Sequence, residues 1–352
     1  MPDMGKTLGI GLIGVNNRAR RVVLPGFAAS PHSRVSALCS RTLDKARDAA
    51  ADFEGVRAYA VFEDLLADPD VNTVFINTPN ATHYRLTLQA LAAGKHVVCE
   101  KPLSETEVEA EALYEAARRA GVRTAVNFTL RSLPGPRTVA RLLSRGSIGT
   151  LLGFEVTTMQ SRGFDPRYSR NDGLADLGPH LVDLLAWWAD AAGAGFVVEV
   201  TAAATSFVDS KVRFSGQSPD NVSTHALIRL DGGATGFLGI VRVAHGFGNA
   251  YRALLFGSDG CIEMSFDTGE PRIRLGKGSG PLVEGGWQDI SIPHDLAVSY
   301  ADFPRVHFGR IAAAIAGAGE FPDFGVGLRA QRILDALSSS SRTSSWTPVR
   351  QP

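Results

Sequence analysis

The sequence predicts an α/β protein in which a doubly wound parallel sheet is followed by an α+β region with a large, mostly antiparallel open sheet. Over residues 8–126, short apolar runs alternate with amphipathic segments, which is the order of strands and helices in a parallel sheet covered on both faces. Beyond residue 128, successive runs rich in Val, Thr, Phe and Ile are joined by turns such as Asp231-Gly232-Gly233, which favours antiparallel pairing. The 352 residues suffice for two hydrophobic cores, so we expect domains over residues 1–128 and 129–352.

The first domain shows both strand and helix signals. Five apolar runs are expected to form its parallel strands, at residues 8–13, 35–39, 71–76, 97–99 and 124–126. The clearest helices between them cover residues 43–52, 84–93 and 105–120. Gly94 and Gly121 follow the last two of these helices, where a glycine in the left-handed conformation commonly ends a helix. Ser104, with Glu107 three residues later, has the spacing of a capping box for the third helix.

The second domain begins with a change of pattern at Pro134-Gly135-Pro136, after which a helix is expected over residues 137–144. A longer helix is expected to open near Asp176, with Pro179 in its first turn, where the missing amide hydrogen costs nothing. The expected strands of this domain cover residues 151–158, 196–208, 222–230, 235–243, 251–256 and 261–266. A helix is expected again over residues 325–338, and the serine-rich residues 338–345 are expected to form a loop.

The composition argues against a strongly charged partner. The 36 basic and 36 acidic residues give a pI near 7.1, so the chain lacks the charge that binds nucleic acid or an anionic membrane, and we expect a small-molecule partner. The three cysteines, Cys39, Cys99 and Cys261, lie in apolar strand-like runs and indicate buried thiols in a reducing compartment. Residues 1–7 lack the pattern of a signal peptide, and no apolar run reaches the roughly 18 residues of a membrane span. We therefore expect a soluble, cytoplasmic protein.

A glycine-containing turn follows the first strand. Gly9, Gly11 and Gly14 spell G-x-G-x-x-G, but Gly9 and Gly11 lie within the strand itself, so this match begins too early. The functional turn is instead expected at Gly14, Asn16, Asn17, Arg18 and Ala19. In a Rossmann domain such a turn and the helix after it bind the pyrophosphate of a dinucleotide. Asn16 stands where a second glycine is usual, and Asn tolerates left-handed backbone angles better than most residues. A plain strand-to-helix turn without a ligand is the competing interpretation.

The end of the second strand predicts which dinucleotide is bound. A carboxylate at this place usually binds the ribose 2′-hydroxyl of NAD, but here the chain reads Cys39-Ser40-Arg41. A guanidinium and a hydroxyl suit the 2′-phosphate of NADP, because an arginine can pair with the phosphate and stack on adenine. Arg18 is expected to add positive charge. We therefore expect NADP(H) to be preferred, with NAD(H) possible; a solvated arginine at a helix start is the alternative interpretation of Arg41.

Two further motifs carry groups that transfer protons. Glu100-Lys101-Pro102 closes an apolar strand, so Lys101 should emerge at the carboxyl end of the parallel sheet, where ligands bind. Asp176, His180 and Asp183 follow one another at spacings that place them on one helix face. Oxidation of an alcohol requires a base as the hydride departs. His180 is the natural base, Lys101 stabilises negative charge on the oxygen or relays the proton, and Asp176 orients these groups or the substrate.

Taken singly, these residues have ordinary structural interpretations. A lysine before a proline is more often a solvated loop residue, and a histidine at a helix start is more often a cap or a core group. His245, His294 and His307 show no partner spacing and are expected to be structural or surface residues. No metal is expected, because the sequence lacks a further convergent His or Cys cluster beside Asp176 and His180.

Together the motifs resemble the glucose-fructose oxidoreductase, inositol dehydrogenase and rhizopine-catabolism oxidoreductase family, often shortened to Gfo/Idh/MocA. The matching segments, spread over nearly the full length, are Gly14–Ala19, Leu24-Pro25, Thr78–His83, Ala93–Val97 running into Glu100–Pro102, and Asp176–Asp183. The resemblance implies that Pro79, Asn80 and His83 line the nicotinamide side of the cofactor, and that Thr78, Glu100 and Lys101 also bind it. It further implies that the peptide before Pro102 is often cis, and that the outer face of the C-terminal sheet builds homodimers or homotetramers.

The resemblance also implies the substrate class, a secondary alcohol or ketone of a sugar, cyclitol or related small polyol. The expected substrate-binding residues are Lys101, Asn127, Arg131, Tyr168, Asp176 and His180. Where relatives commonly read Gly-Phe-Asn before an arginine, this chain has Asn127-Phe128-Thr129 and then Arg131. Other members of the family hydrolyse glycosides through transient oxidation with a tightly held NAD, or bind a dinucleotide as regulators without turnover, and both remain open alternatives.

Overall fold

The structure, a computed structural model, describes residues 7–162, 172–205, 222–267, 269–278 and 286–351. Its contacts group into two compact units. The first unit comprises residues 1–132 and 298–331, and the second comprises residues 133–297 and 332–352. The expected boundary at residue 128 puts residues 298–331 in the second domain, whereas the structure groups this segment with the first unit.

The first unit contains a six-stranded, wholly parallel sheet with the strand order β3-β2-β1-β4-β5-β6. Its strands are β1 (Leu8–Ile13), β2 (Ser33–Cys39), β3 (Arg57–Tyr59), β4 (Thr73–Ile76), β5 (His96–Cys99) and β6 (Thr124–Val126). This is the strand order of a Rossmann fold, so the predicted doubly wound sheet is confirmed. The order reverses between β1 and β4, and the segments that follow the strands share the carboxyl edge, where such sheets bind their ligands.

The helices of the first unit come from both of its segments. They are α1 (Leu24–Ala28), which continues a π-helical turn at Ala19–Val23, then α2 (Leu43–Ala50), α3 (Phe62–Ala67), α4 (His83–Ala92), α5 (Glu107–Ala120) and α8 (Phe303–Ala316), with 3₁₀ turns at Asn80–Thr82 and Thr129–Ser132. The predicted capping box of α5 is wrong by two residues. The hydroxyl of Thr106 accepts from the Glu109 amide at 3.3 Å, while Ser104 is buried and donates to the Thr106 carbonyl at 2.9 Å. Gly121 ends α5 with a φ of +64°, as predicted.

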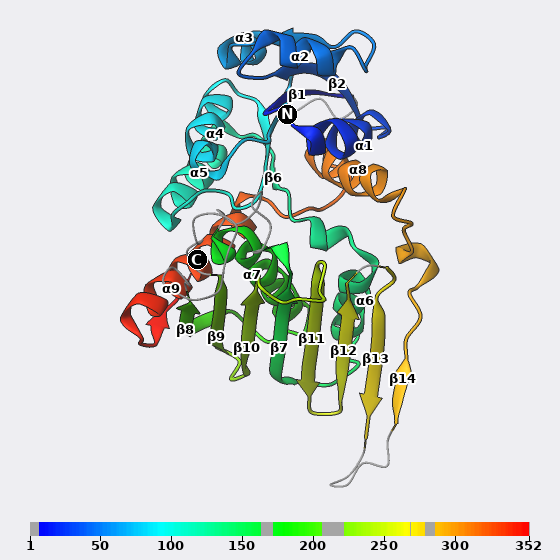
Figure 1. Cartoon of the computed structure of the whole chain (residues 1–352), viewed down its shortest axis with the longest axis vertical. Coiled ribbons are helices and arrows are strands. Elements are labelled where there is room, and N and C mark those ends of the chain that lie inside the picture. Colours follow the sequence, from blue (N-terminus) through cyan, green and yellow to red (C-terminus); the bar gives the residue numbers. More distant parts are fainter. Residues whose placement is uncertain (1–6, 163–171, 206–221, 268, 279–285, 352) are drawn as a thin grey trace. The chain divides into compact units, whose positions relative to one another are not determined.

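Helix α8, which the sequence pattern did not predict, completes the core of the first unit beside α1 (Figure 1). The ring centroid of Phe308 lies 4.9 Å from that of Phe27 and 6.0 Å from that of Phe75. A Cβ added to Gly26 on α1 would lie 2.4 Å from the Phe308 ring, so a glycine at this position lets the two helices approach closely. Because this contact is apolar and buried, the segment that carries α8 belongs physically with the parallel sheet.

The second unit is built around a nine-stranded sheet with the order β14-β13-β12-β11-β7-β10-β9-β8-β15 (Figure 1). Its strands are β7 (Leu151–Met159), β8 (Val197–Thr205), β9 (Ser223–Leu230), β10 (Thr235–Val241), β11 (Ala250–Gly257), β12 (Gly260–Phe266), β13 (Arg272–Lys277), β14 (Trp287–Asp289) and β15 (Thr347–Pro348). All neighbouring strands are antiparallel except β7 and β10, so the predicted mostly antiparallel sheet is confirmed. Helices α6 (Pro134–Ser144) and α7 (Gly173–Ala191) pack against the sheet, a 3₁₀ turn lies at His294–Leu296, and α9 (Phe324–Thr343) contributes its residues from 332 onward.

Some local predictions for the later part of the chain are wrong. Helix α7 begins at Gly173 rather than near Asp176, because the Asp172 carboxylate accepts from the amides of residues 174 and 175 at 2.7 and 3.1 Å. Pro179 therefore lies inside the helix and not in its first turn. Helix α9 extends to Thr343, so most of the serine-rich segment is helical. Two of its hydroxyls donate to carbonyls in the preceding turn, Ser341 to that of residue 338 at 2.9 Å and Thr343 to that of residue 339 at 3.1 Å.

Within the ranges given above, no helix is both long and apolar enough to cross a membrane. Cys39 and Cys99 are buried, Cys261 is half-buried, and all three are free thiols.

Candidate active site

The turn after β1 has a backbone geometry that glycine adopts readily and other residues do not. Gly14 has a φ of +100°, and a Cβ built there would lie 2.2 Å from the Asn77 carbonyl oxygen. The Asn77 side chain donates to the Gly14 carbonyl at 2.7 Å, which ties the turns after β1 and β4 together. Gly9 and Gly11 lie inside β1 against neighbouring residues, so these two glycines allow close packing of the sheet, as expected for a motif that begins too early.

Asn16 caps the helical segment that follows this turn. Its Oδ1 accepts from the Ala19 amide at 2.8 Å, so the side chain points to the helix start. Asn16, Asn17 and Arg18 are exposed, whereas Ala19 is buried. An exposed helix start beside a close-packed glycine, at the carboxyl edge of a parallel sheet, fits the pyrophosphate of a dinucleotide.

The residues after β2 supply a hydroxyl and a guanidinium. The Ser40 amide donates to the Tyr59 carbonyl at 3.2 Å, which holds this segment beside β3; Ser40 is buried and Arg41 is exposed. Arg18, which was expected to add to the positive charge here, instead pairs with Glu100 at 2.5 Å. Because that ion pair neutralises the positive charge of Arg18, recognition of a 2′-phosphate at this place would depend on the guanidinium of Arg41.

The segment after β4 contains an internal histidine. Pro79 is exposed, Thr78 and Asn80 are half-buried, and His83 is fully buried. The His83 Nδ1 lies 2.8 Å from the Pro102 carbonyl oxygen and its Nε2 lies 2.9 Å from the Thr78 carbonyl oxygen. Carbonyls only accept, so both ring nitrogens donate. Burial lowers the pKa of His83, but Cys99 and the two carbonyls outweigh it and raise that pKa to about 9. His83 therefore joins two segments from inside the unit, with both ring nitrogens already hydrogen-bonded to carbonyls.

The motif after β5 is organised by the Glu100 carboxylate. Oε1 accepts from Arg18 at 2.5 Å and from the Asn127 side chain at 2.7 Å, and Oε2 accepts from the Lys101 amide at 3.3 Å. Glu100 is buried, Lys101 is half-buried, and the peptide between Lys101 and Pro102 is cis, as the resemblance implies. The structure thus joins Arg18, Glu100 and Lys101, which the sequence placed in two separate motifs.

Asn127 has an internal role rather than the expected substrate contact. It is fully buried, its Nδ2 donates to Glu100, and its Oδ1 lies 2.6 Å from the Nε2 of His307. Arg131 is half-buried in a 3₁₀ turn, and its carbonyl accepts from Arg310 at 2.7 Å. His307, expected to be a structural or surface residue, is a buried member of this cluster. Its pairing with Asn127 could not be predicted, because the two residues lie far apart in the sequence.

In the second unit, helix α7 carries the other proposed catalytic residues. Asp176 and His180 are half-buried, one turn apart, whereas Asp183 is buried. Tyr168, an expected substrate contact, lies outside the described residues.

A buried arginine lies beside Asp176. Arg242, which follows β10, is 0% exposed and its guanidinium is 3.7 Å from the Asp176 carboxylate. Burial lowers the pKa of Arg242, and Asp176 and Asp172 act against this effect. Tyr251 on β11 is also buried, and burial raises its pKa to about 12. The sequence analysis missed Arg242, because an isolated arginine after a strand is ordinarily a surface residue.

The described residues contain no group of three or more His, Cys, Asp or Glu side chains that could hold a metal ion.

Comparison with known proteins agrees with this geometry. The chain matches the family model for the oxidoreductase family with an NAD-binding Rossmann fold over residues 8–128, and that for the GFO/IDH/MocA C-terminal domain over residues 137–263. Levoglucosan dehydrogenase from Pseudarthrobacter phenanthrenivorans is 26% identical over 98% of this chain and 97% of its own length. 1,5-anhydro-D-fructose reductase from Ensifer adhaerens is 36% identical over 42% of this chain and 44% of its own length.

Solved structures share the fold over almost the whole chain. An oxidoreductase domain protein from Kribbella flavida is 26% identical with a TM-score of 0.82, covering 98% of this chain and 100% of that one. Levoglucosan dehydrogenase in complex with NADH is 24% identical with a TM-score of 0.84, covering 99% of this chain and 100% of that one. With both family models matched in order along the chain, this protein belongs to the Gfo/Idh/MocA family of oxidoreductases.

Proposed function

We propose that the protein is an NADP(H)-dependent oxidoreductase that transfers a hydride between the nicotinamide and a secondary alcohol or ketone of a sugar, cyclitol or related small polyol. The observation that carries the proposal is the carboxyl edge of the parallel sheet, where the Gly14 turn, Ser40-Arg41 and Glu100-Lys101 follow β1, β2 and β5. A Rossmann sheet binds its dinucleotide at this edge. Lys101 follows β5, whose carboxyl end lies at this same edge of the sheet. This position supports a role for the Lys101 ammonium group in the chemistry.

When bound, the nicotinamide accepts or supplies the hydride. The protein must then move the proton of the substrate hydroxyl, and we assign His180 as the base that takes it, because imidazole exchanges protons near neutral pH. Lys101 stabilises the negative charge that develops on the substrate oxygen. Asp176, which pairs with Arg242 at 3.7 Å, orients the imidazole or the substrate. In the direction of reduction the same groups return the proton.

Replacing the proton-transfer residues tests this assignment. Lys101→Ala and His180→Ala should each lower turnover on the order of a hundredfold or more while leaving cofactor affinity nearly intact. Lys45→Ala and His294→Ala remove exposed side chains of the same types and should leave both quantities unchanged. A loss of cofactor binding equal to the loss of turnover would make Lys101 and His180 structural residues instead.

The proposed substrate class is supported by the family and by its named members. Two relatives are, by name, a levoglucosan dehydrogenase and a 1,5-anhydro-D-fructose reductase, and both names refer to sugar derivatives. Arg131 and Tyr168 are proposed contacts for the substrate hydroxyls. A panel of hexoses, pentoses, cyclitols, anhydro sugars and sugar nucleotides, tested with both cofactors in both directions, should reveal hydride transfer. Release of sugar from an aryl glycoside without net cofactor reduction would favour the hydrolase instead, and no turnover with any compound would favour a regulator.

The preference for NADP(H) is proposed from Arg41. A guanidinium that pairs with the 2′-phosphate should make NADPH bind on the order of tenfold more tightly than NADH. Arg41→Asp should reverse this preference, because a carboxylate accepts from the ribose hydroxyl and repels the phosphate. Arg47→Ala, at another exposed arginine in the following helix, is the control. Tighter binding of NADH to the unaltered protein in a fluorescence titration would contradict the proposal.

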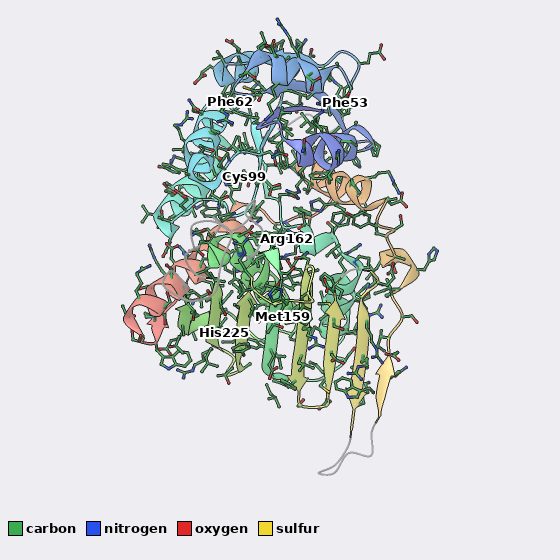
Figure 2. All side chains as sticks on the ribbon, in the orientation of Figure 1. Phe53, Phe62, Cys99, Met159, Arg162 and His225 are labelled. Carbon is green, nitrogen blue, oxygen red and sulfur yellow. The ribbon has the colours of Figure 1, made fainter. Side chains whose placement is uncertain are left out.

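We propose that the outer face of the nine-stranded sheet forms a homodimer or homotetramer. Residues on this face, among them Met159 and His225, labelled in Figure 2, line a hollow of about 380 Å³. Leu227 and Phe256, in the same alternation along β9 and β11, are 51% and 40% exposed. Exposed apolar side chains that gather on one face are typical of protein interfaces. Sedimentation should show a dimer or tetramer that Leu227→Glu dissociates, and a monomeric unaltered protein would contradict this proposal.

A further inference from the structure

A series of buried hydrogen bonds leads from α8 to the carboxylate after β5. The His307 Nε2 lies 2.6 Å from the Asn127 Oδ1, and the Asn127 Nδ2 donates to the Glu100 Oε1 at 2.7 Å. On the other side of the imidazole, Nδ1 lies 2.8 Å from the Ser132 hydroxyl, which also accepts from Arg310 at 3.1 Å. His307, Asn127 and Ser132 are each 0% exposed, so water does not compete for these bonds.

The chemistry of the groups determines which atom donates in each bond. An ionised carboxylate only accepts, so the amide nitrogen of Asn127 faces Glu100 and the amide oxygen faces His307. Because that oxygen only accepts, the His307 Nε2 carries a hydrogen. Its Nδ1 can then accept from the Ser132 hydroxyl, since a neutral imidazole has one donor and one acceptor. In each hydrogen bond of the series, the donor is therefore the group farther from Glu100 and the acceptor is the group nearer to it. Hydrogen bonds aligned in this way strengthen one another.

The surroundings of His307 agree with a neutral ring. Burial, together with the positive charges of Arg18 and Arg310, lowers the pKa of His307 to about 3. The stacked ring of Phe303 lies with its centroid 5.3 Å away and that of Phe308 lies 4.8 Å away, so two apolar side chains of the same helix fix the orientation of the imidazole. The hydrogen on Nε2 is thus aimed at Asn127 by packing as well as by hydrogen bonding.

Glu100 connects this series to residues at the carboxyl edge of the sheet. Its Oε1 accepts from both Arg18 and Asn127, and two donors on one oxygen restrict rotation of the carboxylate. Its Oε2 accepts from the backbone amide of Lys101. Arg18 opens the helical segment after the Gly14 turn, and Lys101 is the proposed catalytic lysine, so one carboxylate holds both in place.

We propose that His307 is a positioning residue for the Glu100 carboxylate and acts on it through Asn127. The oriented carboxylate holds Arg18 and the Lys101 backbone in the arrangement that a nicotinamide dinucleotide requires. This inference rests on the proposed function, because the position of Glu100 affects ligand binding only if this edge of the sheet takes that cofactor. Helix α8 is then part of the cofactor site without touching the cofactor.

The test compares three variants of the full-length protein. His307→Leu removes both ring nitrogens, whereas His307→Gln keeps an amide N–H that can donate to Asn127. Ile311→Ala is the matched control, because Ile311 is 0% exposed on the same helix and takes no part in the series. Dissociation constants for NADPH and NADH are measured without substrate, followed by kcat and KM. We expect about tenfold weaker cofactor binding in His307→Leu and less than about threefold change in the other two.

The outcomes separate this inference from the proposed function. Unaltered cofactor binding in His307→Leu overturns the inference. An equal loss in Ile311→Ala also overturns it, because general packing would then be the cause, and failure of His307→Gln to bind better than His307→Leu shows that the donated hydrogen is not what matters. If the unaltered protein binds neither NADPH nor NADH, the proposed function fails first.

A measurement on the unaltered protein does not depend on how the variants fold. Among the eight histidines, nitrogen-15 NMR should show one ring that keeps a hydrogen on Nε2 and none on Nδ1 down to pH 5, with a signal that is absent from His307→Gln. A hydrogen on Nδ1 of this ring at pH 6 overturns the inference, because the Ser132 hydroxyl could then no longer donate to it.

Discussion

Acid should destabilise the first unit through His307, and the size of the effect follows from the burial of its ring. The pKa of His307 is lowered to about 3 in the folded protein, whereas a histidine in an unfolded chain titrates near about 6.5. Between these values the unfolded state binds a proton that the folded state does not bind. The free energy of unfolding therefore rises with pH across this window and falls on acidification. From pH 7 to pH 5 the loss is about 2 kcal/mol, because the unfolded-state histidine becomes almost fully protonated.

His83 acts in the opposite direction and has to be separated from this effect. Its pKa is raised to about 9, so its stabilising contribution is fully present below about pH 6.5 and is lost as the pH rises through 9. A comparison of the unaltered protein with His307→Gln removes this contribution, because His83 is the same in both proteins. The difference between their pH dependences then isolates His307.

Hydrogen exchange measured by mass spectrometry can follow each unit by itself. Peptides from α8 report on the first unit and peptides from α7 report on the second. Tryptophan fluorescence would miss the effect, because all four tryptophans lie in the second unit, at positions 187, 188, 287 and 346. From pH 7 to pH 5, the free energy of opening at α8 should fall by about 2 kcal/mol more in the unaltered protein than in His307→Gln. The same pH dependence in both proteins would refute the assignment of a neutral, buried His307.

Three further experiments test separate parts of the structure. Gly14→Ala should lower the free energy of unfolding by roughly 1 to 3 kcal/mol, because the added Cβ meets the Asn77 carbonyl at a positive φ; urea denaturation followed by circular dichroism measures this, and unaltered stability would contradict it. Asp172→Ala should cost about 1 kcal/mol in tryptophan-monitored unfolding, and Asp172→Asn should retain most of that stability if the side chain acts as a cap. Cys261 should react with a maleimide before Cys39, because burial raises the pKa of Cys39 to about 11; peptide mass spectrometry showing the reverse order would argue against the buried position of Cys39.

Five strands of the parallel sheet could be predicted because most of their residues are buried, whereas the short strand β3, which has exposed and half-buried residues only, escaped prediction. All six residues of β1 are buried, so the strand is visible in the sequence as one apolar run with correct ends. Strand β13 escaped prediction because four of its six residues are charged or glycine and only Ile273 and Leu275 are buried. Helix α8 escaped for another reason. Pro304, Gly309 and a run of alanines give it a weak pattern, and the face that matters is defined by Phe27 on a distant segment.

Candidate site residues could be proposed from the sequence only where they form short contiguous motifs. Glu100-Lys101-Pro102 and the Asp176 helix are of this kind. Arg242 and His307 are not, because each has its partner far away in the sequence, and a buried arginine has no local signal. His83 shows the opposite case, in which a recognised motif residue is already satisfied by two carbonyls inside the unit.

The place of α8 in the chain implies that residues 1–132 cannot complete the first unit alone. Phe308, Ile311 and Ile315 are at most 2% exposed, and burying three such side chains contributes roughly 5 to 9 kcal/mol, which is comparable with the whole stability of a domain. A fragment of residues 1–132 should therefore show no cooperative thermal unfolding by circular dichroism. The same fragment joined to residues 298–331 by a flexible linker should unfold cooperatively, and a cooperative transition of the short fragment at the same temperature would show that α8 is dispensable. If the fusion folds and the short fragment does not, the first unit of this oxidoreductase folds only after residues 133–297 of the second unit, which precede α8 in the chain, have been synthesised.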